Sequence, residues 1–248
     1  MIKWTAVAIL LAFASRANAQ TFLSRYAFHL DAEHLGSNDD RFSWDADLGG
    51  DIDLLDYGAG RATFLANYQV IVGDQFRRFD ANQGNYTLEG ALSVRAKPIE
   101  LAAVFHHVSR HLSDRDKRQA VDWNMLGARL ASAGSAGRLA LRGQIDARGV
   151  VERAFVDYRW EVAGALGAGY EIRPHVTFIT GGDLRLVGTD GSRDRATQVG
   201  ARGEAGIRLE GAAGAVELFV AGERRVDPYP TQFYTASWVT AGFRLRSR

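Results

Sequence analysis

The stretch Tyr86–Arg95, which reads YTLEGALSVR, changes character at every second residue. One set of alternate positions holds Tyr, Leu, Gly, Leu and Val, and the other holds Thr, Glu, Ala, Ser and Arg. Successive side chains of a β-strand point to opposite sides, so an alternation with period two indicates a strand whose faces meet different surroundings. The stretch therefore predicts a strand with one apolar face and one polar face.

The same alternation recurs along most of the chain. It is clearest in Trp44–Leu54, Leu139–Asp146, Val156–Val162 and Gln198–Leu209. After residue 19, no run of ten or more residues has the 3.6-residue period of an amphipathic helix. We predict an all-β chain of about twelve strands, at 22–34, 41–56, 60–73, 85–97, 99–111, 123–133, 137–148, 154–166, 174–187, 196–210, 214–225 and 234–246.

The N-terminus has the three regions of a secretory signal. Lys3 gives a basic start, Thr5–Ala14 is an apolar run, and Ala17–Ala19 supplies the small-x-small pattern of a cleavage site. A run of ten apolar residues is well short of the roughly 20 that a membrane-spanning helix needs. We predict a signal peptide over residues 1–19, cut before Gln20, and a β-barrel over residues 20–248.

Strand length and connection length favour a barrel that spans a membrane. Several predicted strands exceed the typical ~5–6 residues and suit a tilted membrane strand of ~9–11. Connections after even-numbered strands are mostly short, such as Tyr57–Ala59, although Gly167–Arg173 is longer. Those after odd-numbered strands are mostly longer and polar, such as Asp74–Gly84 and Gly149–Arg153. A soluble barrel or sandwich shows the same alternation, but this loop asymmetry and the signal predict a transmembrane antiparallel up-and-down β-barrel in the outer membrane.

The composition excludes several classes of protein. The 248 residues include 30 basic and 29 acidic side chains, which excludes a strongly basic nucleic-acid binder. There is no cysteine, so a disulfide scaffold and a thiol nucleophile are excluded. No phosphate loop, HExxH motif or EF-hand loop occurs, and we expect no cofactor and no resident metal. The mixed charges of the polar face predict a lumen crosslinked by ion pairs. Interfacial girdles or ordinary wall packing are the two interpretations of Trp44, Trp123, Trp160, Trp238, Tyr26, Tyr68, Tyr86 and Tyr158.

One segment concentrates three of the six histidines beside a serine. Phe105–Asp114 reads FHHVSRHLSD and lies at the end of the fifth predicted strand, at the outer rim of the barrel. His107, Ser109 and His111 share one face, because strand side chains repeat every two residues. Cα atoms two residues apart in a strand are about 6.5–7 Å from each other, which lets an imidazole reach a hydroxyl and activate it as a nucleophile.

Asn124 is the best candidate for a third member that orients the imidazole through its other nitrogen. A hairpin centred on residues 112–122 brings Asn124 near His107, and Asp114 and Asp122 are the alternatives. Asn124 shares the face of its strand that is predicted to contact lipid. Whether His107 and Ser109 face lipid or lumen stays open from the sequence, because apolar residues occur on both sides of the fifth strand.

The segment H107-x-S109-x-H111-L112-x-D114 resembles the H-x-S-S-H-L-G-D segment of an uncharacterised family of bacterial outer-membrane barrels. The chain departs from that pattern at Arg110 and Ser113, which replace the second serine and the glycine. More distantly, the H-x-S pair resembles that of outer-membrane phospholipase A and lipid A deacylase, which are serine hydrolases of the barrel wall. That resemblance implies His107 as general base, Ser109 as nucleophile and Asn124 as the orienting residue.

Two other interpretations of the segment stay open. His107, His111 and Asp114 have the side chains of a zinc site. In the second, the chain is a noncatalytic structural or ligand-binding envelope barrel, or a narrow pore, whose rim binds lipid. Expected partners are outer-membrane lipids or lipopolysaccharide and the barrel-assembly machinery, and not nucleic acid. Residues expected to contact substrate or lipopolysaccharide phosphates are His111, Asp114, Arg110, Arg115, Lys117 and Arg118.

Overall fold

The computed structural model describes residues 20–116 and 119–247, so the predicted signal peptide over 1–19 lies outside the described residues. No helix in the described ranges is long and apolar enough to cross a membrane. The described residues form twelve strands: β1 (Thr21–Leu35), β2 (Trp44–Asp56), β3 (Arg61–Gly73), β4 (Asp80–Ala96), β5 (Ile99–Leu112), β6 (Asp122–Ala136), β7 (Leu139–Ala154), β8 (Tyr158–Arg173), β9 (Val176–Thr189), β10 (Gln198–Glu210), β11 (Gly214–Val226) and β12 (Thr235–Ser247).

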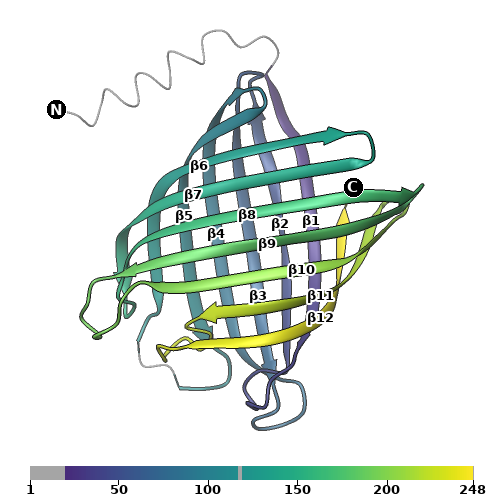
Figure 1. Cartoon of the computed structure of the whole chain (residues 1–248). Coiled ribbons are helices and arrows are strands. Elements are labelled where there is room, and N and C mark those ends of the chain that lie inside the picture. Colours follow the sequence, from purple (N-terminus) through teal and green to yellow (C-terminus); the bar gives the residue numbers. More distant parts are fainter. Residues whose placement is uncertain (1–19, 117–118, 248) are drawn as a thin grey trace, which may run out of the picture.

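The strands form one closed antiparallel barrel. Each strand pairs with its neighbours in sequence, and β1 pairs with β12 from His29↔Arg246 to Leu35↔Thr240. Closure removes the two free sheet edges that an open sheet would present to lipid. Short connections gather at one end, which we call the turn end, and the longer ones gather at the opposite loop end, at the lower left of Figure 1. By the rule for such barrels, the turn end faces the periplasm.

The predicted strand number and most strand positions are confirmed, but two predicted connections are wrong and a third, Asp74–Gly84, is shorter than predicted because β4 begins at Asp80. Gly149–Arg153 belongs to β7, and Gly167–Arg173 belongs to β8. The connection between these strands is only Phe155–Asp157. Register shifts occur near both corrected stretches, where an extra residue is inserted in one strand. Such bulges interrupt the period-two alternation, which is why the sequence pattern predicts loops in both stretches.

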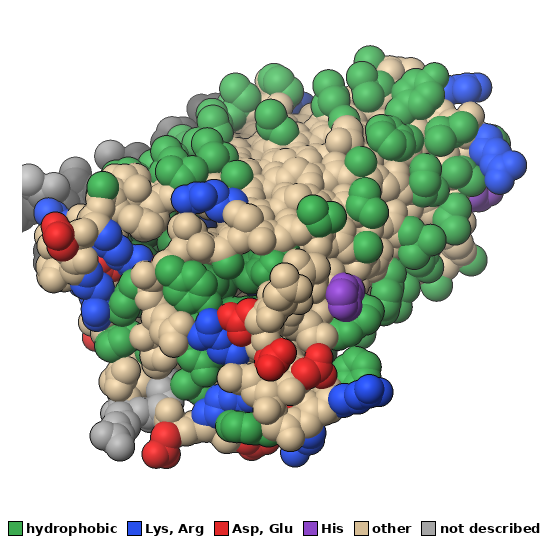
Figure 2. Space-filling model, turned by 60° about the horizontal axis from the view of Figure 1, so that its bottom comes forward, with side chains coloured by type: hydrophobic (Ala, Val, Ile, Leu, Met, Phe, Trp, Pro, Cys, Tyr) green, Lys and Arg blue, Asp and Glu red, His purple; other side chains and the backbone are tan. Residues whose placement is uncertain are grey.

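The outer wall of the barrel is apolar (Figure 2). Its alternate positions expose large hydrophobic side chains, whereas charged side chains gather around the loops in the lower part of that view. An apolar wall outside a closed barrel matches a lipid environment, and the reverse arrangement would be expected of a soluble barrel. Examples of these exposed residues are Leu101, Leu126, Ile145, Leu166, Leu218 and Val239.

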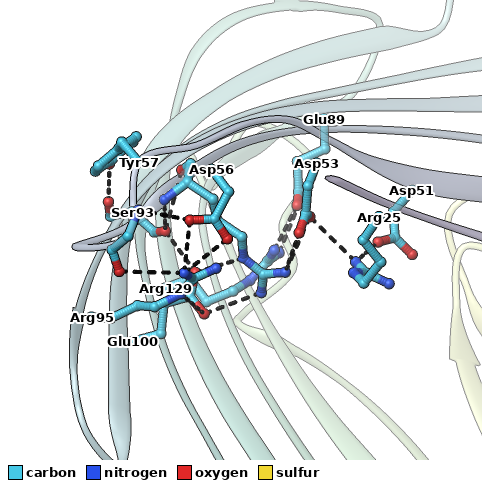
Figure 3. A network of polar contacts seen from close by, with 12 residues as sticks. Arg25, Asp51, Asp53, Asp56, Tyr57, Glu89, Ser93, Arg95, Glu100 and Arg129 are labelled. Carbon is cyan, nitrogen blue, oxygen red and sulfur yellow. Dashed lines mark hydrogen bonds and ion pairs between the residues drawn. The ribbon is translucent and has the colours of Figure 1, made fainter. Parts of the chain in front are cut away.

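The lumen is crosslinked by ion pairs, as predicted (Figure 3). Glu89 is 5% exposed and accepts hydrogen bonds from Arg129 at 2.6 and 2.9 Å. Arg129 also pairs with Asp146 at 2.8 Å, and Arg148 extends the network from Asp146 to Glu161. These ion pairs connect strands across the inside of the barrel and occupy the middle of the lumen with side chains.

The girdle interpretation is wrong for three of the eight aromatic residues. Trp123, Tyr158 and Trp238 are at most 7% exposed and lie in two hydrophobic clusters inside the loop end. Tyr158 and Trp160 were predicted on one face, but a register shift between them places Trp160 outside and Tyr158 inside.

Candidate functional site

The face of β5 that carries the histidine and serine segment is the outer wall. Leu101 and Phe105 are 49% and 44% exposed, whereas Ala102 and Val104 between them are 7% and 2% exposed. No register shift interrupts the pairing of β5 with β4 or β6. His107, Ser109 and His111 follow Leu101 and Phe105 at every second position, half-buried at 107 and 109 and exposed at 111, so the orientation that the sequence left open is outward, toward lipid.

His107 and Asn124 are in direct contact. They are register partners on β5 and β6, and His107 Nδ1 lies 2.8 Å from Asn124 Oδ1. An amide oxygen accepts a hydrogen bond only from a protonated ring nitrogen, so this contact places the proton of neutral imidazole on Nδ1. Nε2 is then free to accept a proton, as a general base requires.

Asn124 is oriented by a charged residue that the sequence analysis did not identify. Its Nδ2 donates to Oε2 of Glu152 on β7 at 3.1 Å, which fixes the amide with Oδ1 toward His107. The register shifts between Asn124, which pairs with Glu152, and Met125, which pairs with Val150, so Val151 is an extra residue on β7. This bulge turns Glu152 to the outer face, where Val151 is also 59% exposed.

Ser109 contacts a different imidazole from the predicted one. Its hydroxyl lies 2.9 Å from Nε2 of His111, and no hydrogen bond joins it to His107 within the described ranges. The His111 ring packs edge-on against Tyr86 on β4, with ring centroids 5.4 Å apart at 78°. Ser109 therefore stands between two imidazoles on one strand face, at positions two residues before and two residues after it.

The contacts of the other predicted site residues do not fit the roles that the sequence predicts for them. Arg110 points into the barrel and donates to the backbone oxygens of Asp227 and Pro228, which differs from the expected contact with lipopolysaccharide at the rim. Asp114 is exposed in the loop after β5 and pairs with Arg77 at 3.6 Å. Asp122 lies opposite Ser109 in register, but its side chain makes no hydrogen bond in the part of the chain described.

Two more expectations concern metal and phosphate ligands. No group of three or more His, Asp or Glu side chains among the described residues is arranged to hold a metal ion, so His107, His111 and Asp114 do not form the considered zinc site. Arg115 is taken up by Asp80, Gln75 and a backbone oxygen. Lys117 and Arg118 lie outside the described residues.

Sequence reasoning missed Glu152 and the role of Tyr86. Glu152 was assigned to a loop, and only the bulge reveals its face. Tyr86 lies opposite Ser109 in the β4–β5 register, a pairing that the lengths of the two strands and their short turn could have indicated. Together these residues make an outward-facing array at the loop end of β4 to β7: Tyr86, His107, Ser109, His111, Asn124 and Glu152.

Comparison with known proteins supports the fold. No family model and no curated protein sequence matches this chain. It is similar to the outer membrane phospholipase of Salmonella typhi, crystallised as a dimer with bound calcium, with a TM-score of 0.55 and 10% identity over 96% of this chain and 97% of that one. It is also similar to outer membrane phospholipase A from Escherichia coli, with a TM-score of 0.52 and 12% identity over 90% and 97% of the two chains.

At such identities the likeness shows the fold alone. It confirms the predicted outer-membrane β-barrel architecture, and it agrees with the apolar outer wall of an integral outer-membrane protein. The resemblance of residues 107–114 to the H-x-S-S-H-L-G-D segment of the uncharacterised family stays a prediction.

Proposed function

We propose that this chain is a serine-type acyl hydrolase that cleaves ester-linked acyl chains of outer-leaflet phospholipid or lipid A. The observation that carries the proposal is the 2.8 Å contact between His107 and Asn124 on the lipid-facing wall, with Ser109 two residues along the same face. Nucleophile, base and orienting residue are the three parts that serine hydrolysis requires. Their place on the outer wall gives a lipid ester access without entry into the lumen.

In the proposed reaction, Ser109 Oγ bonds to the ester carbonyl carbon while its proton passes to Nε2 of His107. The bond from the carbonyl carbon to the leaving oxygen then breaks, and the imidazolium returns the proton to that oxygen. Water attacks the acyl-serine, again losing a proton to His107, and fatty acid and free Ser109 are released. Rotation of the Ser109 side chain between staggered positions moves Oγ from His111 toward His107.

Glu152 acts in this proposal as a positioning residue. A carboxylate accepts hydrogen bonds and donates none, so Glu152 can contact only the NH2 group of Asn124. The 3.1 Å contact therefore selects the amide orientation that His107 needs. Because Asn124 lies between Glu152 and His107, the carboxylate supports the orientation of the imidazole without a direct ion pair.

The test is the release of fatty acid by purified barrel in detergent micelles that contain phospholipid or lipid A. Wild-type protein should release fatty acid from one of the two, and Ser109→Ala should lower the rate by at least 10³-fold, because the nucleophile is removed. Ser113→Ala is the matched control, since Ser113 lies on the same rim and, among the described residues, only its backbone N–H and C=O form hydrogen bonds. Absence of turnover with both substrates, or full activity of Ser109→Ala, would favour a noncatalytic envelope barrel.

A further inference from the structure

The lumen at the turn end contains a cavity of about 1200 Å³ with an unusual charge distribution. Arg142, Arg208, Arg244 and Arg246 line it together, and Glu217 forms ion pairs with the last three of them. Glu217 is 1% exposed and contacts Arg208 at 2.6 Å, Arg244 at 2.9 Å and Arg246 at 3.4 Å. One carboxylate thus meets three guanidinium groups.

Carboxylates from elsewhere in the lumen do not balance this group. Besides Glu217, Arg244 also forms ion pairs with Asp31 and Glu204. Arg208 and Arg246 have no acidic partner other than Glu217 among the described residues. The side chain of Arg142 has neither a hydrogen bond nor an ion pair with any of the described residues. The turn end therefore holds guanidinium donors in excess of acceptors, unlike the paired networks around Glu89.

Arg142 is held inside the cavity by a glycine. It is the register partner of Gly167 on β8, and a Cβ at Gly167 would stand 2.8 Å from Nε of Arg142. The guanidinium thus lies along the backbone of β8, in the space that a larger residue would fill. Small residues on the same side of the cavity, including Ala133, Ser135 and Ala165, leave room beside it.

We infer that this cavity is a binding site for a small anion with at least two phosphate or carboxylate groups, which enters from the periplasmic end. Guanidinium groups present fork-shaped donors that match both oxyanions, and charge-assisted hydrogen bonds of this type are among the strong ones. The ion pairs around Glu89 and Glu161 crosslink the middle of the lumen, so the turn end is the open approach. The site is separate from Ser109, which lies on the outer wall near the loop end.

Titration calorimetry in detergent at low salt tests this inference, with pyrophosphate and citrate as the two probes. We expect saturable binding of at least one probe, and the preferred one identifies phosphate or carboxylate as the recognised group. Arg142→Gln should weaken binding at least tenfold while leaving the gel mobility of the folded barrel unchanged, because Arg142 supports no ion pair. Arg138→Gln is the matched control, an exposed arginine at the same end that does not line the cavity. Failure of both probes to saturate, or equal weakening by the two variants, would overturn the inference.

Discussion

At the scale of single residues, Ser109 is flanked by two histidines that the structure treats differently. His107 is anchored by Asn124, whereas His111 holds the serine hydroxyl and packs against Tyr86. A catalytic base needs a partner on its second ring nitrogen, and the amide oxygen of Asn124 supplies one for His107. The two rings therefore predict different consequences when each is removed.

His107→Ala should lower the rate of fatty acid release by about 10²–10⁴-fold, the usual contribution of general base catalysis. His111→Ala should lower it by less than about tenfold, because its proposed role is to hold the resting hydroxyl and not to accept the proton. Initial rates on one lipid substrate measure both. A larger loss in His111→Ala than in His107→Ala would reverse the assignment of the base.

Glu152→Gln tests the bulge on β7. Glutamine can present its own NH2 to Asn124 and permit the flipped amide, so we expect a rate loss of up to about tenfold with unchanged folding. Glu171→Gln, at an exposed position near the turn end of β8, is the charge-matched control. Equal rates for wild type and Glu152→Gln would remove Glu152 from the site.

At the scale of strands and loops, the alternation in the sequence predicted twelve strands because a strand with lipid on one side and ion pairs on the other must segregate its side chains. The prediction failed where bulges occur, at Val151 and beside Arg159. A bulge depends on the pairing of two strands, which a single run of residues does not encode. For the same reason the His107–Asn124 pair was predictable from hairpin geometry, while Glu152 was not.

The loop end carries a contact that joins both sides of the β1–β12 closure. Arg41, in the loop after β1, donates to Gln232 at 2.7 Å, and its guanidinium lies 4.9 Å from the ring centre of Tyr229. Arg41 also donates to Asp39 at 2.6 Å, and this hydrogen bond holds the pKa of Asp39 below its ordinary value. Because the pKa of Asp39 is lower in the folded loop than in the unfolded chain, ionised Asp39 stabilises the folded loop above about pH 4. This contribution is lost as the pH falls through the lowered pKa.

Arg41→Ala should therefore speed proteolytic cleavage in the loop at residues 227–234 several-fold at neutral pH, without loss of the barrel. Limited proteolysis followed by mass spectrometry measures the cleavage. Arg77→Ala, in the loop after β3, is the control because Arg77 makes one long ion pair with an exposed partner. Unchanged cleavage in Arg41→Ala would show that the two loops are held by other contacts.

At the scale of the whole molecule, the acidic and basic side chains of the sequence form ion pairs that connect strands inside the barrel. Buried charges are costly when one partner is removed, at about 3–5 kcal/mol. Glu217→Gln should therefore lower the free energy of unfolding by up to that amount, because Arg208, Arg244 and Arg246 lose their shared carboxylate. Urea unfolding of the reconstituted barrel measures it, with exposed Glu210→Gln as the control. Equal stability of the two variants would contradict a structural role for this network.

The proposed function requires that the closed barrel present an activated serine to lipid on its outer wall. The most direct measurement is covalent labelling of the folded, purified barrel with a long-chain alkyl fluorophosphonate, followed by peptide mass spectrometry. We expect one adduct, on Ser109, that is lost in Ser109→Ala and strongly slowed in His107→Ala. No adduct at Ser109, or labelling that proceeds equally in His107→Ala, would contradict the claim.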